Sequence, residues 1–215
     1  MKKDTAPSRP RGRPRGFDRD AALEQALQLF WRRGYEGTSI ADLTEELGIT
    51  APSLYSAFTS KAELYREALA RYRAQEGALA ARTLAEEPTF QAAVSRMLRE
   101  SAHEFTRPGR PGGCMVSTAV LGCASENEEV ARHVASLRGD TLRVLRERVE
   151  QAISEGELPA DTDAEALARF IGAVVQGMSV QARDGADEAA LLAIVETALK
   201  AIDASTGASR KRKKS

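Results

Sequence analysis

Residues 38–61 read TSIADLTEELGITAPSLYSAFTSK, and their spacing predicts two short helices around a tight turn. Thr38 and Ser39 stand where a helix would begin, because their side-chain oxygens can accept hydrogen bonds from free backbone N–H groups. Gly48 ends the first helix, since glycine readily adopts the left-handed conformation of a helix C-terminus. Thr50 can cap the second helix. Apolar residues then recur with helical spacing in both segments: Ile40, Leu43 and Leu47, then Leu54, Ala57 and Phe58.

This spacing is that of a helix-turn-helix, in which the second helix enters the major groove of DNA. The residues outside its apolar face are small or form hydrogen bonds, which permits a close approach to base edges. They are Thr50, Ala51, Pro52, Ser53, Tyr55 and Ser56. An ordinary helical hairpin with a solvated polar face has the same periodicity, so spacing alone leaves both interpretations open.

A longer stretch, from about Phe17 to about Tyr72, resembles the DNA-binding domain of the tetracycline-repressor (TetR) family. The matching segments are FWRRGYEGTS at 30–39, IADL at 40–43, LGI at 47–49, SLY at 53–55 and SK at 60–61. The resemblance implies that Tyr55 lies at the edge of the groove and that Lys61 contacts a phosphate. We therefore expect Thr38, Ser39 and Lys61 to bind DNA together with the second helix.

The composition predicts an all-α fold of about nine helices. Alanine and leucine are abundant beside glutamate and arginine, and no segment alternates as a strand does. We expect a basic arm (1–16), a three-helix DNA-binding domain (17–73), a larger helical domain for ligand binding and dimerisation (74–205) and a basic tail (206–215). No apolar run has the length of a membrane span. With only two cysteines, the sequence is typical of a cytoplasmic protein.

Charge is distributed unevenly although the formal net charge is zero. Basic residues gather at both ends of the chain, which indicates a polyanionic partner. The segment PRGRPR at 10–15 resembles an AT-hook, an arm that lies in the minor groove of A·T-rich DNA. Arg11, Arg13 and Arg15 would then follow the negative potential of a narrow groove. A linker that is merely rich in Arg and Pro is the alternative.

Further helices are predicted along the second domain. Their ranges are 61–82, 88–106, 114–124, 126–154, 163–183 and 187–203. The last two have wide apolar faces, and the family resemblance implies that they pair with a second copy in a four-helix dimer interface. We expect Phe170, Val174, Met178, Val195 and Leu199 in this interface. A monomeric core would produce the same apolar faces.

Cys114 is the candidate sensor. The segment RPGGCMV at 110–116 resembles the branch of the family that contains the N-ethylmaleimide-reductase repressor and the copper-responsive repressor. In the first turn of a helix and near Arg107 and Arg110, the thiolate of Cys114 would be favoured over the thiol. A packed, unreactive residue is the alternative. We expect Cys123 to be buried.

No catalytic, metal-binding or cofactor-binding set is predicted. His103 and His133 are isolated, and an enzyme would need one of them beside Cys114 as a base. The sequence therefore predicts a homodimeric repressor, not an enzyme and without a membrane partner, that binds a palindromic double-stranded DNA operator. A small-molecule inducer of unknown identity or modification of Cys114 would release it. The alternative is an architectural DNA-binding protein without an inducer.

Overall fold

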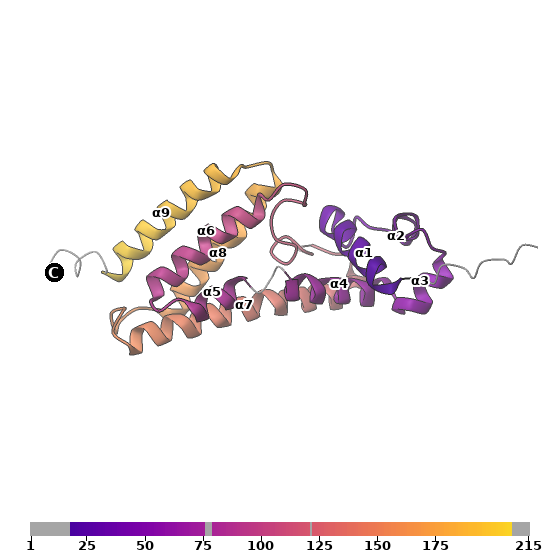
Figure 1. Cartoon of the computed structure of the whole chain (residues 1–215). Helices are drawn as coiled ribbons and strands as arrows, with labels where there is room; N and C mark the ends of the chain where they lie inside the picture. Colours follow the sequence, from indigo (N-terminus) through magenta and orange to yellow (C-terminus); the bar gives the residue numbers. More distant parts are fainter. Residues whose placement is uncertain (1–17, 76–78, 121, 208–215) are drawn as a thin grey trace, which may run out of the picture.

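The computed structural model of the protein describes residues 18–75, 79–120 and 122–207, which form nine α-helices and one short 3-10 helix, with no strand among them. The elements are α1 Arg19–Arg33, α2 Ile40–Leu47, α3 Ala51–Phe58, α4 Lys61–Gln75, α5 Leu79–Glu86, α6 Phe90–Phe105, η1 Ser125–Asn127, α7 Glu128–Ser154, α8 Ala164–Arg183 and α9 Glu188–Thr206. The all-α class is therefore confirmed. In Figure 1, α1, α2 and α3 form one end of an elongated molecule and α6, α8 and α9 the other, with α4 and α7 along the side between them.

The first three helices begin and end where the sequence predicts. Asp18, Ser39 and Thr50 each accept a hydrogen bond from a backbone N–H in the first turn of the helix that follows. Gly34 and Gly48 follow α1 and α2 with φ of 74° and 63°, a region that costs glycine little. These local signals set the lengths and the connecting turns of the three helices.

Aromatic side chains hold α1 on α4. Phe30 of α1 meets Tyr65 of α4 edge-on with ring centroids 4.9 Å apart, and Trp31 meets Tyr72 in the same way at 4.9 Å. Tyr35 lies 5.0 Å from Tyr65. All five side chains are at most 5% exposed. Each edge-to-face pair contributes about 0.5–1.5 kcal/mol beyond the burial of its surface, so these contacts fix α1 on α4.

A second core lies between α6, α7, α8 and α9. Leu98, Leu145, Ile171 and Val195, one from each helix, are at most 1% exposed. The chain between α6 and α7 joins this core to the first one, because Met115, Val116 and Ala119 pack among the buried residues of α1–α4. The two cores are therefore joined by this segment as well as by the helices that run between the two ends of the molecule.

The predicted helix 114–124 is wrong, because the described residues of this segment form turns. Gly113 has φ of 75°, and a Cβ atom there would lie 2.3 Å from the carbonyl oxygen of Ser179 in α8. The backbone groups that a helix would have satisfied have distant partners instead. The N–H of Cys114 donates to Ser179 Oγ at 2.7 Å, and Arg138 of α7 donates to the Ala119 carbonyl at 2.9 Å.

The single helix predicted over 61–82 is also corrected, since the structure has two helices there. α4 ends at Gln75 and α5 begins at Leu79, on either side of residues outside the described ranges. α5 packs on α6, with Leu84 4% exposed and Arg82 paired with Glu100 at 3.0 Å.

Candidate DNA-binding surface and regulatory cavity

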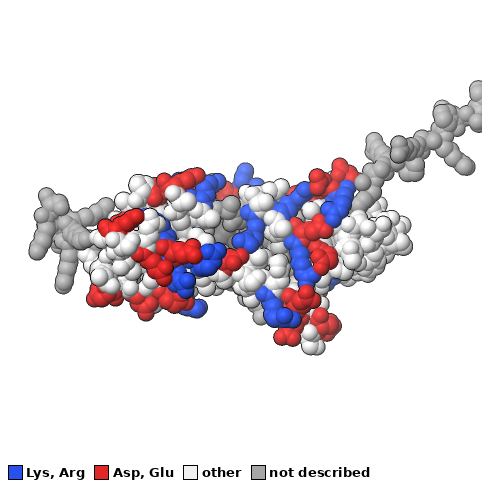
Figure 2. Space-filling view, turned by 90° about the horizontal axis from the view of Figure 1, so that it is seen from below, with Lys and Arg blue, Asp and Glu red and all other residues white. Residues whose placement is uncertain are grey.

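α3 presents an uncharged surface at the end of the molecule. Leu54 and Phe58 anchor it in the core with at most 1% exposure, which turns the opposite face outward. Tyr55 on that face is 47% exposed. The other exposed residues are Thr50, Pro52, Ser53 and Ser56, and Ala51 is half-buried beside them. In Figure 2 the end formed by α3 is free of charged residues, next to bands of basic and acidic side chains. This surface has the shape and chemistry for close contact with a groove.

Thr38 and Ser39 differ in their availability to a ligand. Thr38 is fully buried, and its hydroxyl donates to the Gly34 carbonyl at 2.7 Å, so its side chain supports the turn before α2. Ser39 is exposed, but its side chain forms a reciprocal capping box with Asp42. Hydrogen bonds from Ser39, and then the nearby Arg33, lower the pKa of Asp42 to about 2. Direct DNA contact by the Thr38 side chain is incompatible with this burial, which corrects that expectation.

Lys61 is the first residue of α4 and lies close to α3. Its Nζ stands 4.1 Å from the centroid of the Tyr35 ring, a cation–π contact. Partial burial lowers its pKa, while Glu36 and Asp42 oppose the shift. The arm residues predicted to enter the minor groove, Arg11, Arg13 and Arg15, lie outside the described residues.

Two connections between the DNA-binding end and the rest of the chain were not predicted from the sequence. Glu36, after α1, accepts hydrogen bonds from the Ala124 N–H at 3.1 Å and from Asn127 Nδ2 at 2.9 Å. The exposed Arg183 at the end of α8 donates to the carbonyls of Trp31 and Arg32 at 3.0 and 2.8 Å. A basic residue at the end of a helix often binds the last carbonyls of that helix. The sequence does not show that Arg183, at the end of α8, binds those of α1 instead.

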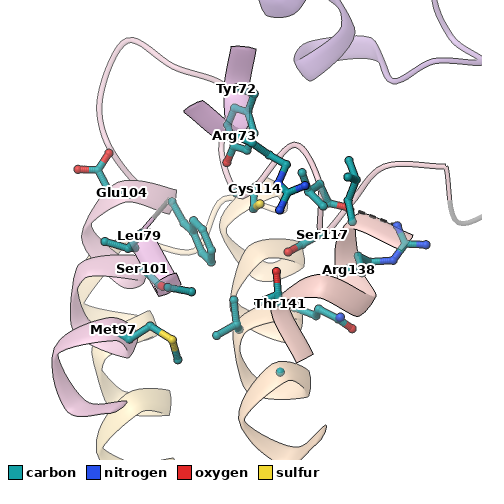
Figure 3. Close-up of a pocket in the computed structure, with 18 of the residues that line it drawn as sticks. Tyr72, Arg73, Leu79, Met97, Ser101, Glu104, Cys114, Ser117, Arg138 and Thr141 are labelled. Carbon is teal, nitrogen blue, oxygen red and sulfur yellow. Dashed lines mark hydrogen bonds between the residues drawn. The ribbon is translucent and has the colours of Figure 1, made fainter. Parts of the chain in front are cut away.

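A cavity lies between α4, α6, α7 and α8, next to the DNA-binding end. Its apolar wall includes Met97, Phe105, Leu137, Leu142, Leu145 and Val175. Its polar lining includes Arg73, Ser101, Glu104, Cys114, Ser117, Arg138 and Thr141. Figure 3 shows Arg73, Cys114 and Thr141 turned toward this space. An apolar cavity with a few polar groups is the usual form of a small-molecule site.

The structure gives Cys114 a different environment from the one predicted. Cys114 is half-buried and lines the cavity, but it starts no helix, so no helix dipole acts on it. Arg107 and Arg110 each pair with Glu104, at 3.4 and 3.5 Å. Cys123 is exposed, contrary to the expectation that it is buried.

The five residues predicted for the dimer interface fall into two groups. Met178 and Val195 are fully buried within the chain's own core, so they are unavailable to a second copy and that part of the prediction is corrected. Phe170 is 41% exposed, and Val174 and Leu199 are half-buried. Periodicity could not separate the groups, because α6 packs on both α8 and α9 within the chain.

Neither histidine lies at the cavity. His103 is exposed with Nδ1 3.3 Å from Glu188, and His133 is half-buried on α7. No group of three or more His, Cys, Asp or Glu side chains in the described ranges could hold a metal ion. Among the same residues, every helix is too short or too polar to span a bilayer.

A helix-turn-helix joined by α4 to a larger helical unit is the architecture of a DNA-binding transcription regulator. Comparison with known proteins identifies the family. Residues 22–68 match the model of "Bacterial regulatory proteins, tetR family", and residues 91–198 match the "Tetracyclin repressor-like, C-terminal domain". The chain belongs to the TetR family and is a DNA-binding transcriptional repressor.

Its relatives include transcriptional repressors. The chain is 38% identical over 191 residues to the HTH-type transcriptional repressor ComR of Escherichia coli (strain K12), covering 88% of this chain and 91% of ComR. The repressor BdcR of the same strain is 29% identical over 180 residues, 83% and 85% of the two chains. A cysteine-substituted form of the TetR family regulator CifR, complexed with a 26-bp double-strand operator DNA, superposes with a TM-score of 0.84 at 47% identity, covering 88% of this chain and 99% of that one.

Proposed function

We propose that the protein acts as a homodimer that represses transcription from a palindromic operator and is released when the cavity is occupied or Cys114 is modified. The position of the cavity carries this proposal. α4 starts at Lys61, close to α3, and its far end supplies Tyr72 and Arg73 to the cavity. An occupant that displaces this end of α4 would therefore move the DNA-binding surface.

α3 supplies the direct readout in this proposal. Its exposed Ser53, Tyr55 and Ser56 offer hydrogen-bonding groups, and the absence of charge on α3 leaves phosphate contact to Lys61 and the arm. The operator complex of CifR supports this assignment by similarity. Arg11, Arg13 and Arg15 would add affinity that depends on salt, because each displaces counterions from the DNA backbone.

The exposed part of α8 and α9 forms the dimer interface in this proposal. Phe170 and Val180 are 41% and 43% exposed, unusually so for large apolar side chains, and Val174 and Leu199 are half-buried on the same two helices. A two-fold pair would present two copies of α3 to the two halves of a palindrome.

Modification of Cys114 would change the cavity directly. Its backbone N–H is held by Ser179 of α8, and the residues after it pack in the core of the DNA-binding end. A group added to Sγ would need space in the cavity or would displace this segment. Either change would alter how the residues after Cys114 pack against α1 and α4.

A footprint on DNA that includes the protein's own promoter tests the proposal. We expect one protected palindrome that loses protection in Tyr55→Ala. Protection spread over A·T-rich DNA, unchanged in Tyr55→Ala, would favour the architectural alternative and contradict sequence-specific repression.

A further inference from the structure

Arg183, the last residue of α8, forms hydrogen bonds to two other segments at once. Its Nη1 donates to the Trp31 carbonyl at 3.0 Å and to Thr118 Oγ1 at 3.5 Å, and its Nη2 donates to the Arg32 carbonyl at 2.8 Å. All three acceptors are neutral oxygens, and none of them belongs to α8. A planar guanidinium suits such a set, because its N–H groups point in fixed directions. Arg183 therefore joins α1 to the chain between α6 and α7.

The segment 112–118 lies directly on the same end of α8. A Cβ atom at Gly113 would lie 2.3 Å from the Ser179 carbonyl oxygen, so the backbone approaches α8 more closely than other residues permit. The N–H of Cys114 donates to Ser179 Oγ at 2.7 Å, and Thr118 Oγ1 donates to the Cys114 carbonyl at 2.9 Å. Gly113 and Cys114 both line the cavity. An occupant beside Cys114 would therefore displace this segment along α8 or move α8 with it.

The end of α1 that Arg183 binds is connected to the helix-turn-helix. Arg32 pairs with Glu46 of α2 at 2.8 Å. Arg33 pairs with Asp42 of α2 at 2.6 Å. Solvent weakens both exposed pairs, so the packing of α1 on α2 in the core is the stronger link. A shift of the last turn of α1 therefore changes the position of α2 and, through it, of α3.

We propose that Arg183 is the positioning residue that couples occupation of the cavity to operator binding. With segment 112–118 in place, the guanidinium of Arg183 holds the last turn of α1 in the position that the operator requires. Displacement of this segment moves Thr118 away from the guanidinium and breaks the bonds to α1. The inference rests on the proposed function, since it takes the cavity to be the effector site, and it adds a route to α1 beside the one through α4. The coupling is reciprocal, so operator binding also favours the undisplaced segment.

The coupling is measured as the ratio of operator affinities before and after alkylation of Cys114. Iodoacetamide is the probe, and full-length Cys123→Ser protein is the background because Cys123 is exposed. Arg183→Ala removes all three hydrogen bonds. In this variant we expect the ratio to fall about fivefold, the worth of about one net hydrogen bond. The unmodified protein loses contacts that support operator binding, whereas the alkylated protein has already lost them. A role in stability alone would lower both affinities equally and leave the ratio unchanged.

Two further variants in the same background test the route itself. Thr118→Val keeps the shape of the side chain and leaves the bonds between Arg183 and α1, and we expect it to lower the ratio about twofold. Glu36→Ala removes the other connection to the DNA-binding end, which leads to Ala124 and Asn127 and not to the cavity lining. We expect this control to leave the ratio unchanged. Thermal unfolding of each variant checks its folding.

An unchanged ratio in both Arg183→Ala and Thr118→Val would overturn the proposal, and Thr118→Val alone decides if the alanine variant does not fold. A ratio that falls as far in Glu36→Ala as in Arg183→Ala would also overturn it, because the coupling would then not depend on Arg183 in particular. Failure of the proposed function would look different. The background protein itself would then keep its operator affinity after complete alkylation, which would contradict both claims together.

Discussion

Replacing Arg183 with alanine removes a connection between α8 and the DNA-binding end. Arg183 donates to the carbonyls of Trp31 and Arg32, which belong to the last turn of α1. Hydrogen bonds from a charged group contribute about 1.5–3 kcal/mol when buried. Arg183 is exposed, so solvent screening reduces the expected loss to about 1 kcal/mol for both bonds together.

Urea unfolding followed by Trp31 fluorescence measures this loss at the junction itself. With a slope of about 2.5 kcal/mol per M urea, a loss of about 1 kcal/mol lowers the midpoint by about 0.4 M. Arg169→Ala is the matched control, because Arg169 lies on the same helix and pairs at 2.6 Å with Glu165 on the surface. We expect the control to shift the midpoint by less than half as much. Equal midpoints for the two variants at equal protein concentration would refute the role assigned to Arg183.

Three further predictions concern other surfaces. Lys61→Ala should weaken binding to all DNA sequences and lower by about one the slope of log affinity against log salt concentration. Tyr55→Ala should weaken binding to the operator more than binding to random DNA, and equal losses of affinity on both DNAs would contradict direct readout by Tyr55. Phe170→Glu or Val174→Asp should give monomers in sedimentation velocity, because an unpaired charge is costly in an apolar interface, while Gln151→Glu on the exposed face of α7 should leave the dimer intact; an unchanged dimer in both interface variants would place the interface elsewhere. The pKa of Asp42 is about 2 in the folded state and near 3.9 when unfolded, so the ionised carboxylate of Asp42 stabilises the fold fully above about pH 5 and about half as much at pH 3. The difference in unfolding free energy between wild type and Asp42→Asn should therefore be smaller at pH 3 than at pH 7, and an equal difference at the two pH values would contradict this role of Asp42.

The DNA-binding end could be predicted in detail because its signals are local. Asp18, Ser39 and Thr50 satisfy backbone donors within a few residues, and Gly34 and Gly48 take positive φ values. Each choice depends on neighbours in sequence, so α1, α2 and α3 follow from the residues themselves.

The segment after Gly113 could not be predicted in the same way. Small and apolar residues satisfy a helical pattern there, but the backbone is bound by Ser179 and Arg138, which are 65 and 19 positions away from their partners. The prediction of the dimer interface was incorrect in part for a related reason. Val195 and Leu199 share an apolar stripe on α9, and the packing of α6 and α8 on this helix leaves the first fully buried and the second half-buried.

Coupling between the cavity and operator binding is tested most directly by alkylating Cys114. Iodoacetamide adds a carbamidomethyl group to Sγ, which places an occupant in the cavity whatever the natural effector is. The assay is fluorescence anisotropy of a labelled operator, with Cys123→Ser as the background because the exposed Cys123 would also react. We predict that alkylation releases the operator from the Cys123→Ser protein and leaves the Cys114→Ser, Cys123→Ser protein bound. Complete modification of Cys114, verified by mass spectrometry, with unchanged operator affinity would contradict the account.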